Sequence, residues 1–171
     1  SGATDAIHFY SIKDEEVIRT FQREDLINIS SPKYSDDGSR LVFHAVDQKG
    51  FSDIFLLDLF DNSLTRLTND YYDDRDPVFG GNEKVIFSSD RTGGEYEKIY
   101  NLFSYDLNTN RVEYLTYLNA NCYAPVLSPD KQELYFTSDY DGVRNIWKVS
   151  RNNEIFSDSI YKVTDFVTSA F

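Results

Sequence analysis

Short runs of apolar and aromatic residues, separated by polar turns, recur along the whole chain. Clear examples are residues 41–43, 85–87 and 134–136, each of which ends in Phe and is followed by an acidic segment. No long stretch places apolar residues at the 3.6-residue spacing of a helix, so we expect little helix. The pattern therefore predicts an all-β chain of short antiparallel strands.

Three sequence blocks recur about 48 residues apart and define an internal repeat. The first block is a Leu or Val followed by Thr. The second is a Pro, nine residues after the Thr in the later copies. The third is Asp or Asn, then Ile or Leu, then an aromatic residue. The marker residues are Thr68, Thr116 and Thr164; Pro32, Pro77 and Pro125; and Asp53, Asn101 and Asn145.

Each repeat contains four candidate strands. In the second repeat a strand is expected to start at Pro77, and residues 80–82 are expected to turn because Gly and Asn accept positive φ. The remaining expected elements of this repeat are a strand at 84–88, a polar hairpin loop at 90–98, a strand at 99–107 and a strand at 111–115. Four short strands per 40–50 residues are typical of a β-propeller blade.

The repeats do not add up to a whole ring. The expected segments are the outer strands of a preceding blade at 1–21, whole blades at 22–68, 69–116 and 117–164, and the start of a further blade at 165–171. That makes about three and a half blades, whereas closed propellers have 4–8. We therefore expect an incomplete, open propeller. We expect it to be a fragment of a larger ring, or its open ends to pair with another chain, because unpaired edges promote association.

The repeats resemble a known family. Residues 31–43 are similar to the Ser-Pro-Asp-Gly-Lys turn and apolar strand of TolB-like (WD40-like) propeller repeats, and residues 53–55, 65–68 and 128–130 extend the match. The second repeat departs from this pattern at residues 80–82. The resemblance implies a non-catalytic protein-binding or scaffold module of the bacterial envelope, with a periplasmic location. The alternative is the accessory, substrate-gating propeller of a prolyl-oligopeptidase-like or tricorn-like peptidase whose catalytic domain lies outside this chain.

Composition narrows the classes of partner. The 171 residues carry 17 Lys and Arg against 29 Asp and Glu, a net charge of −12. Nucleic acids and anionic membranes attract basic proteins, so neither is expected as a partner. No apolar run approaches the roughly 18 residues of a membrane span, so membrane insertion is not expected. Most of the 13 Phe, 13 Tyr and 1 Trp are expected to fill the space between blades.

No catalytic residues are expected. His8 and His44 are the two candidate bases, and both fall in strands where a structural role is favoured. Cys122 has acidic residues as its nearest charged neighbours in the sequence, which does not favour a thiolate. Because no Cys and His cluster is visible, a zinc site is not expected.

One segment stands out as a candidate binding surface. It carries four Asp and two Tyr within seven residues, and in a propeller it would connect an outer strand to the next inner strand on one rim. We expect this rim to bind a protein partner, for which a basic surface would be complementary. The candidate residues are Asp70, Tyr71, Tyr72, Asp73, Asp74, Arg75 and Asp76, with Asn119, Asn121 and Tyr123 in the next connection. Calcium would suit the composition, but a solvated loop without a cofactor is the preferred interpretation.

Overall fold

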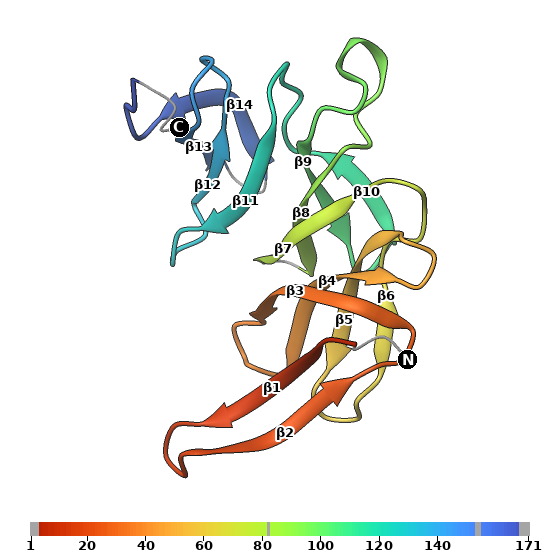
Figure 1. Ribbon diagram of the computed structural model, residues 1–171. Helices are drawn as coiled ribbons and strands as arrows, with labels where there is room; N and C mark the ends of the chain where they lie inside the picture. The colour runs from red at the N-terminus through yellow and green to blue at the C-terminus, as the bar shows by residue number, and fades with distance from the viewer. Residues whose placement is uncertain (1–3, 82, 153–154, 168–171) are drawn as a thin grey trace.

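The computed structural model describes residues 4–81, 83–152 and 155–167. One two-stranded sheet is followed by three four-stranded antiparallel sheets in chain order (Figure 1). We call them sheets 1 to 4. Sheet 1 contains β1 (Ala6–Ser11) and β2 (Glu16–Gln22); sheet 2 contains β3 (Leu26–Tyr34), β4 (Arg40–Asp47), β5 (Ser52–Asp58) and β6 (Leu64–Arg66); sheet 3 contains β7 (Asp74–Gly81), β8 (Lys84–Ser89), β9 (Asn101–Asp106) and β10 (Arg111–Tyr114); and sheet 4 contains β11 (Cys122–Leu127), β12 (Glu133–Ser138), β13 (Asn145–Asn152) and β14 (Ile155–Lys162).

The prediction of four-stranded antiparallel propeller sheets is confirmed. Within the described ranges the sheets form an open arc and not a closed ring (Figure 1). The only helical element among these residues is a single 3-10 turn at Gly94–Tyr96, inside the segment that was expected to be a polar hairpin loop. No helix in the described part of the chain is long and apolar enough to cross a membrane.

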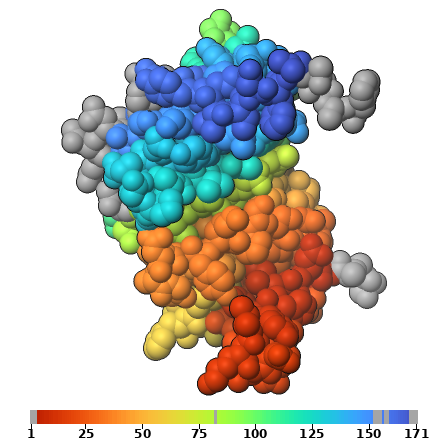
Figure 2. Space-filling view, turned by 90° about the vertical axis from the view of Figure 1, so that its left-hand side faces the viewer, coloured from red at the N-terminus to blue at the C-terminus, as the bar shows by residue number. Residues whose placement is uncertain are grey.

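Three hydrophobic cores lie between successive sheets. Phe43 and Phe55 on sheet 2 stack with a centroid distance of 5.7 Å and face sheet 1, whereas Ile54 faces sheet 3. Phe87 belongs to the core between sheets 2 and 3, and Phe136 to the core between sheets 3 and 4. Figure 2 shows the consequence, since the segments follow one another as adjoining bands from red to blue. The prediction that aromatic residues fill the space between blades is therefore confirmed for these positions.

The first strand of each four-stranded sheet, which we call its inner strand, contains a proline at a β-bulge. The residues before Pro32, Pro77 and Pro125 have φ angles of 53°, 53° and 50°, and the strand register shifts at all three places. The expectation that a strand starts at Pro77 is wrong, because β7 begins three residues earlier, at Asp74. A bulge removes the need for a ladder hydrogen bond at that position, so the missing N–H of Pro is tolerated inside the strand.

The repeated Thr accepts a hydrogen bond from the third strand of its own sheet, and we call this contact the Thr latch. Thr68 Oγ1 accepts a hydrogen bond from the backbone N–H of Ile54 (3.0 Å), which lies in the third strand of the same sheet. Thr116 does the same for Leu102, at 2.9 Å. Thr164 repeats the contact in sheet 4. The recurring Leu/Val-Thr block therefore secures the end of one sheet where the connection to the next sheet begins.

The tight turns between first and second strands differ in detail from the expected alignment. Ser35 and Ser128 are equivalent, because the hydroxyl of each donates to an Asp two residues later, at 2.6 Å in both turns. In the first repeat, the serine equivalent to Ser128 is therefore Ser35 and not Ser31, which precedes Pro32. The corresponding turn of sheet 3 includes Asn82, which lies outside the described residues, as do residues 168–171 of the last expected segment.

Candidate partner-binding site

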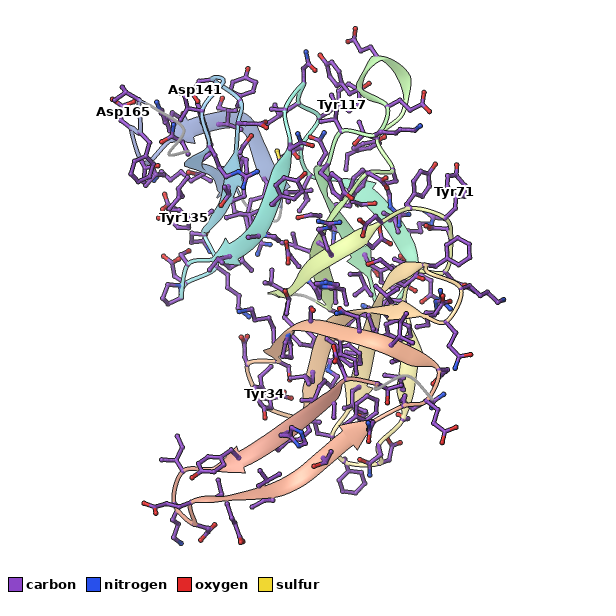
Figure 3. The ribbon with its side chains drawn as sticks, viewed as in Figure 1. Tyr34, Tyr71, Tyr117, Tyr135, Asp141 and Asp165 are labelled. Atoms are coloured by element: carbon purple, nitrogen blue, oxygen red, sulfur yellow. The ribbon has the colours of Figure 1, made fainter. Side chains whose placement is uncertain are left out.

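A pocket of about 460 Å³ lies where sheets 2 and 3 meet. The connection from β6 to β7 supplies one wall, and β4 with the hairpin that leads into β5 supplies the other. Figure 3 shows Tyr71 on this connection, at the edge of the view opposite to Tyr34 and Tyr135. The lining residues are His44, Val46, Gly50, Phe51, Ser52, Tyr71, Tyr72, Asp73, Arg75 and Asp76. Five of these residues belong to the segment that the sequence singled out.

Tyr71 and Tyr72 form an aromatic pair at the mouth of the pocket. Their ring centroids are 4.2 Å apart, and the Tyr71 hydroxyl donates a hydrogen bond to the Tyr72 hydroxyl at 2.8 Å. Tyr71 is 74% exposed, while the Arg91 guanidinium lies over the Tyr72 ring, 5.1 Å from its centroid. Asp70 fixes the turn, since its Oδ1 accepts the backbone N–H of Tyr72 at 3.0 Å. The exposed Tyr71 ring is thus held in place by its neighbours.

Asp73 and Arg75 form an ion pair that Tyr100 extends toward sheet 4. The Tyr100 hydroxyl donates to Asp73 Oδ2 at 2.6 Å, and the Arg75 guanidinium lies 4.7 Å from the Tyr100 ring centroid. Burial alone would raise the pKa of Asp73, but hydrogen bonds from Tyr100 and Arg75 outweigh it, so the pKa is lowered. Burial and the Asp73 carboxylate together raise the pKa of Tyr100. Asp73 is therefore a carboxylate and Tyr100 a hydrogen-bond donor at neutral pH.

Asp74 does not belong to the accessible surface. It is fully buried at the first position of β7, and its Oδ2 accepts a charge-assisted hydrogen bond from Arg91 at 2.6 Å. Burial raises the pKa of Asp74 to about 6, although Arg91 opposes this shift. The expectation that Asp74 contributes to the partner-binding rim with its neighbours therefore conflicts with its burial. Its side chain belongs to the junction between sheets 2 and 3.

Asp76 and His44 meet at the inner side of the pocket. The backbone N–H of Asp76 donates to His44 Nδ1 at 3.2 Å, and the Ser31 hydroxyl donates to the Asp76 carboxylate at 3.0 Å. Burial lowers the pKa of His44, against the opposing effect of the nearby Asp76 carboxylate. Nδ1 accepts a hydrogen bond only in the neutral ring, so this contact requires neutral His44.

His44 is expected to make the protein less stable in mild acid. Its native pKa lies below the unfolded value of about 6.5, so the unfolded chain takes up the proton first. The stabilisation is full above that value and is lost as the pH falls through it. Between pH 7.5 and 5.5, the urea midpoint should fall less in His44→Gln than in the wild type. His8→Gln is the control, and an equal fall in His44→Gln and the wild type would contradict the assignment.

The three remaining candidates, Asn119, Asn121 and Tyr123 at the connection from β10 to β11, have different roles. Asn121 Oδ1 accepts the backbone N–H of Tyr100 at 3.2 Å, and the Tyr123 ring centroid lies 5.0 Å from that of Tyr100. Asn119 is exposed in the same connection. Tyr100 therefore joins Asn121 and Tyr123 to the Asp73–Arg75 pair, beside the pocket and not in its wall. Sequence reasoning missed Tyr100, although its position next to the repeated Asn101 block was a signal.

The remaining reactive side chains have structural contacts. His8 is exposed on β1, and its Nδ1 lies 3.0 Å from the Thr20 hydroxyl on β2. Cys122 is fully buried, and burial raises the pKa of its thiol to about 11, so the thiolate is scarce at neutral pH. The absence of catalytic residues stays a prediction from the sequence.

The fold is shared with solved structures of known proteins. Neither a family model nor a curated protein sequence matches the chain. TolB from Acinetobacter baumannii is similar with a TM-score of 0.70 and 25% identity, over 96% of this chain and 39% of that one. A structure assigned to TolB from Agrobacterium tumefaciens has a TM-score of 0.71 and 18% identity, over 90% of this chain and 53% of that one. The chain thus spans about two fifths to one half of these proteins.

A peptidase contains a similar arrangement of sheets. A puromycin-hydrolysing peptidase from Mycobacterium tuberculosis is similar with a TM-score of 0.61 and 12% identity, over 90% of this chain and 28% of that one. At this identity the likeness concerns the fold alone. Both TolB structures match with higher TM-scores and higher sequence identity than this peptidase. The chain therefore has the fold of a TolB-like β-propeller.

Proposed function

We propose that the chain is a non-catalytic protein-binding module of a bacterial envelope protein, and that the pocket between sheets 2 and 3 receives part of its partner. The observation that carries this proposal is the pocket itself, because five residues of the acidic, aromatic connection line it. The similarity to TolB supports an envelope, periplasmic location. Loops that a rigid β scaffold holds in place are common recognition surfaces.

The chemistry of the pocket favours a Lys or Arg side chain of the partner. Arg75 already pairs with Asp73, whereas the Asp76 carboxylate has a hydroxyl as its partner. Neutral His44 adds no positive charge. The exposed ring of Tyr71 offers its face to a cation, an interaction of about 0.5–2 kcal/mol. A basic side chain could therefore lie between an aromatic face and a carboxylate.

The test is selection of binders from a random peptide display library on the immobilised chain. Enriched peptides should carry Lys or Arg, and their affinity for the double variant Tyr71→Ser, Asp76→Asn should fall about tenfold, equivalent to about 1.4 kcal/mol. Asn tolerates the positive φ of position 76, so the fold should persist. Tyr161→Ser, an exposed change on β14, is the matched control. Peptides that bind both variants equally well would contradict the proposed site.

The accessory propeller of a peptidase is the second candidate. The similarity to a puromycin-hydrolysing peptidase favours it, since that protein combines such sheets with a much longer chain. The coding sequence that flanks this segment distinguishes the two. A neighbouring α/β-hydrolase domain with a Ser, His and Asp triad would support the peptidase candidate, and its absence would favour the binding module.

A further inference from the structure

Three carboxylates converge at the junction between sheets 2 and 3, beside the pocket but separate from its walls. Asp53 comes from β5, Asp70 from the connection and Asp74 from β7, and one oxygen of each lies within 4.8 Å of the others. Asp53 and Asp74 are fully buried, whereas the Asp70 side chain is 31% exposed. A small solute could therefore reach the cluster from the Asp70 side.

The arginines at this junction do not balance the carboxylates. Arg66 pairs with Asp53 and Asp47, and Arg91 pairs with Asp74 and Asp70, so two guanidinium groups serve four carboxylates. The junction carries two negative charges in excess, which one divalent cation would neutralise. An uncompensated charge in a buried position is costly, so this excess itself favours a bound counter-ion.

Two buried oxygens at the junction have no hydrogen-bond partner. Arg66 binds Oδ2 of Asp53 and Arg91 binds Oδ2 of Asp74, but Oδ1 of each carboxylate is buried and unpaired. These two unpaired oxygens are an observation separate from the clustering of the carboxylates. If ion pairs alone saturated the cluster, both oxygens would have a hydrogen-bond partner. Buried polar atoms without a partner are rare and call for a ligand that the side chains alone do not supply.

The internal repeat shows what Asp53 lacks in comparison with the equivalent residues of sheets 3 and 4. The equivalent residue of sheet 3 is Asn101, whose Nδ2 donates to the carbonyl oxygen of Leu118 in the next connection at 3.1 Å. In sheet 4, Asn145 Nδ2 donates to the carbonyl of Phe166 at 3.4 Å. By the 48-residue spacing, the corresponding carbonyl in sheet 2 is that of Asp70. An ionised Asp53 has no N–H with which to make the same contact.

We propose that Asp53, Asp70 and Asp74 bind one divalent cation of the calcium type, which bridges sheets 2 and 3. Every candidate ligand is an oxygen, which selects a hard cation over zinc or copper. The ligands come from two sheets and the connection between them, an irregular set that suits calcium better than the octahedral geometry of magnesium. The cation takes the place of the amide proton that Asn provides in the other two sheets.

The test compares the wild type with Asp53→Asn, the residue that the other repeats carry at this position. Both are freed of metal with a chelator and unfolded in urea at constant ionic strength, with CaCl2 or MgCl2 up to 10 mM. The wild-type midpoint should rise with CaCl2 and saturate, whereas Asp53→Asn should fold and show no calcium dependence. Asp61→Asn, which removes an exposed carboxylate from the β5–β6 turn, should keep the full calcium response.

A second measurement does not depend on unfolding. Terbium, used as the calcium probe, should show luminescence excited through the nearby tyrosines in the wild type and in Asp61→Asn, with a signal at least tenfold weaker in Asp53→Asn. Calcium should displace it. A wild type that responds to neither CaCl2 nor terbium would overturn the proposal, and so would a response that survives in Asp53→Asn. An equal rise of the midpoint with MgCl2 would overturn it by assigning the effect to charge screening.

Discussion

Replacing Arg91 with Met is expected to lower the free energy of unfolding by about 3–5 kcal/mol, because it leaves a buried carboxylate without its counter-charge. Arg91 is 12% exposed and bonds Asp74 at 2.6 Å and Asp70 at 3.2 Å. Met keeps an apolar side chain in the place of the Arg91 stem, whose guanidinium lies 5.5 Å from the Phe87 ring centroid. The loss therefore reports mainly the uncompensated charge. Urea unfolding in the presence of a chelator measures it.

Two companion variants separate the charge from the packing. Arg23→Met removes an exposed ion pair with Asp25 and should change stability by no more than about 1 kcal/mol. The double variant Arg91→Met, Asp74→Leu removes both charges and should recover much of the loss, since Leu26 occupies the equivalent buried position in sheet 2. A single variant as stable as the wild type would show that Asp74 does not depend on Arg91.

Replacing Phe87 with Ala is expected to cost about 3–5 kcal/mol of unfolding free energy. Phe87 is fully buried in the core between sheets 2 and 3, with its ring centroid 6.2 Å from that of Phe103. Removing the ring takes away apolar contact and opens a cavity that strands on both sides hinder from closing. The expected signature is a lower urea midpoint with an unchanged slope, because the surface exposed on unfolding stays similar.

Phe60→Ala is the matched control for this change. Phe60 lies in the β5–β6 turn and is 96% exposed, so its replacement should alter stability by less than about 0.5 kcal/mol. Phe87→Leu should recover part of the loss, because Leu refills much of the volume. If Phe87→Ala and Phe60→Ala were equally stable, the core between sheets 2 and 3 would contribute little to the fold.

The fold was predictable because its markers are local and repeated. Pro32, Pro77 and Pro125 mark one bulge in each inner strand, and the repeated Thr marks the junction between sheets. The predicted starts of strands were less accurate. The start of β7 was placed too late, because this strand begins with polar residues. The residues there, Asp74 and Arg75, have the composition of a loop, and only the pairing with β8 makes them a strand.

The site was predictable only in part, because several of its contacts depend on distant residues. Asp74 has the sequence context of a solvated acidic loop, yet Arg91, 17 positions later, pairs with it in the interior. The repeat did contain a signal, since Leu26 and Cys122 occupy the same register position and both are buried. For the link from Asp73 through Tyr100 to sheet 4, the sequence signalled only the position of Tyr100 beside the Asn101 block, because the contact itself depends on how two sheets pack.

The Thr latch has a consequence for how such repeats can be exchanged. The sequence period ends at Thr68, Thr116 and Thr164, but the contacts of Asn101 and Asn145 continue past the Thr into the connection that follows. A recombination breakpoint at the Thr would separate the partners of this contact. A breakpoint in the turn at residues 35–38 or 128–131 would keep each Thr latch and the connection after it in one inherited segment. Grafted blades should therefore be joined at these turns, so that each Thr and the connection that follows it come from the same parent.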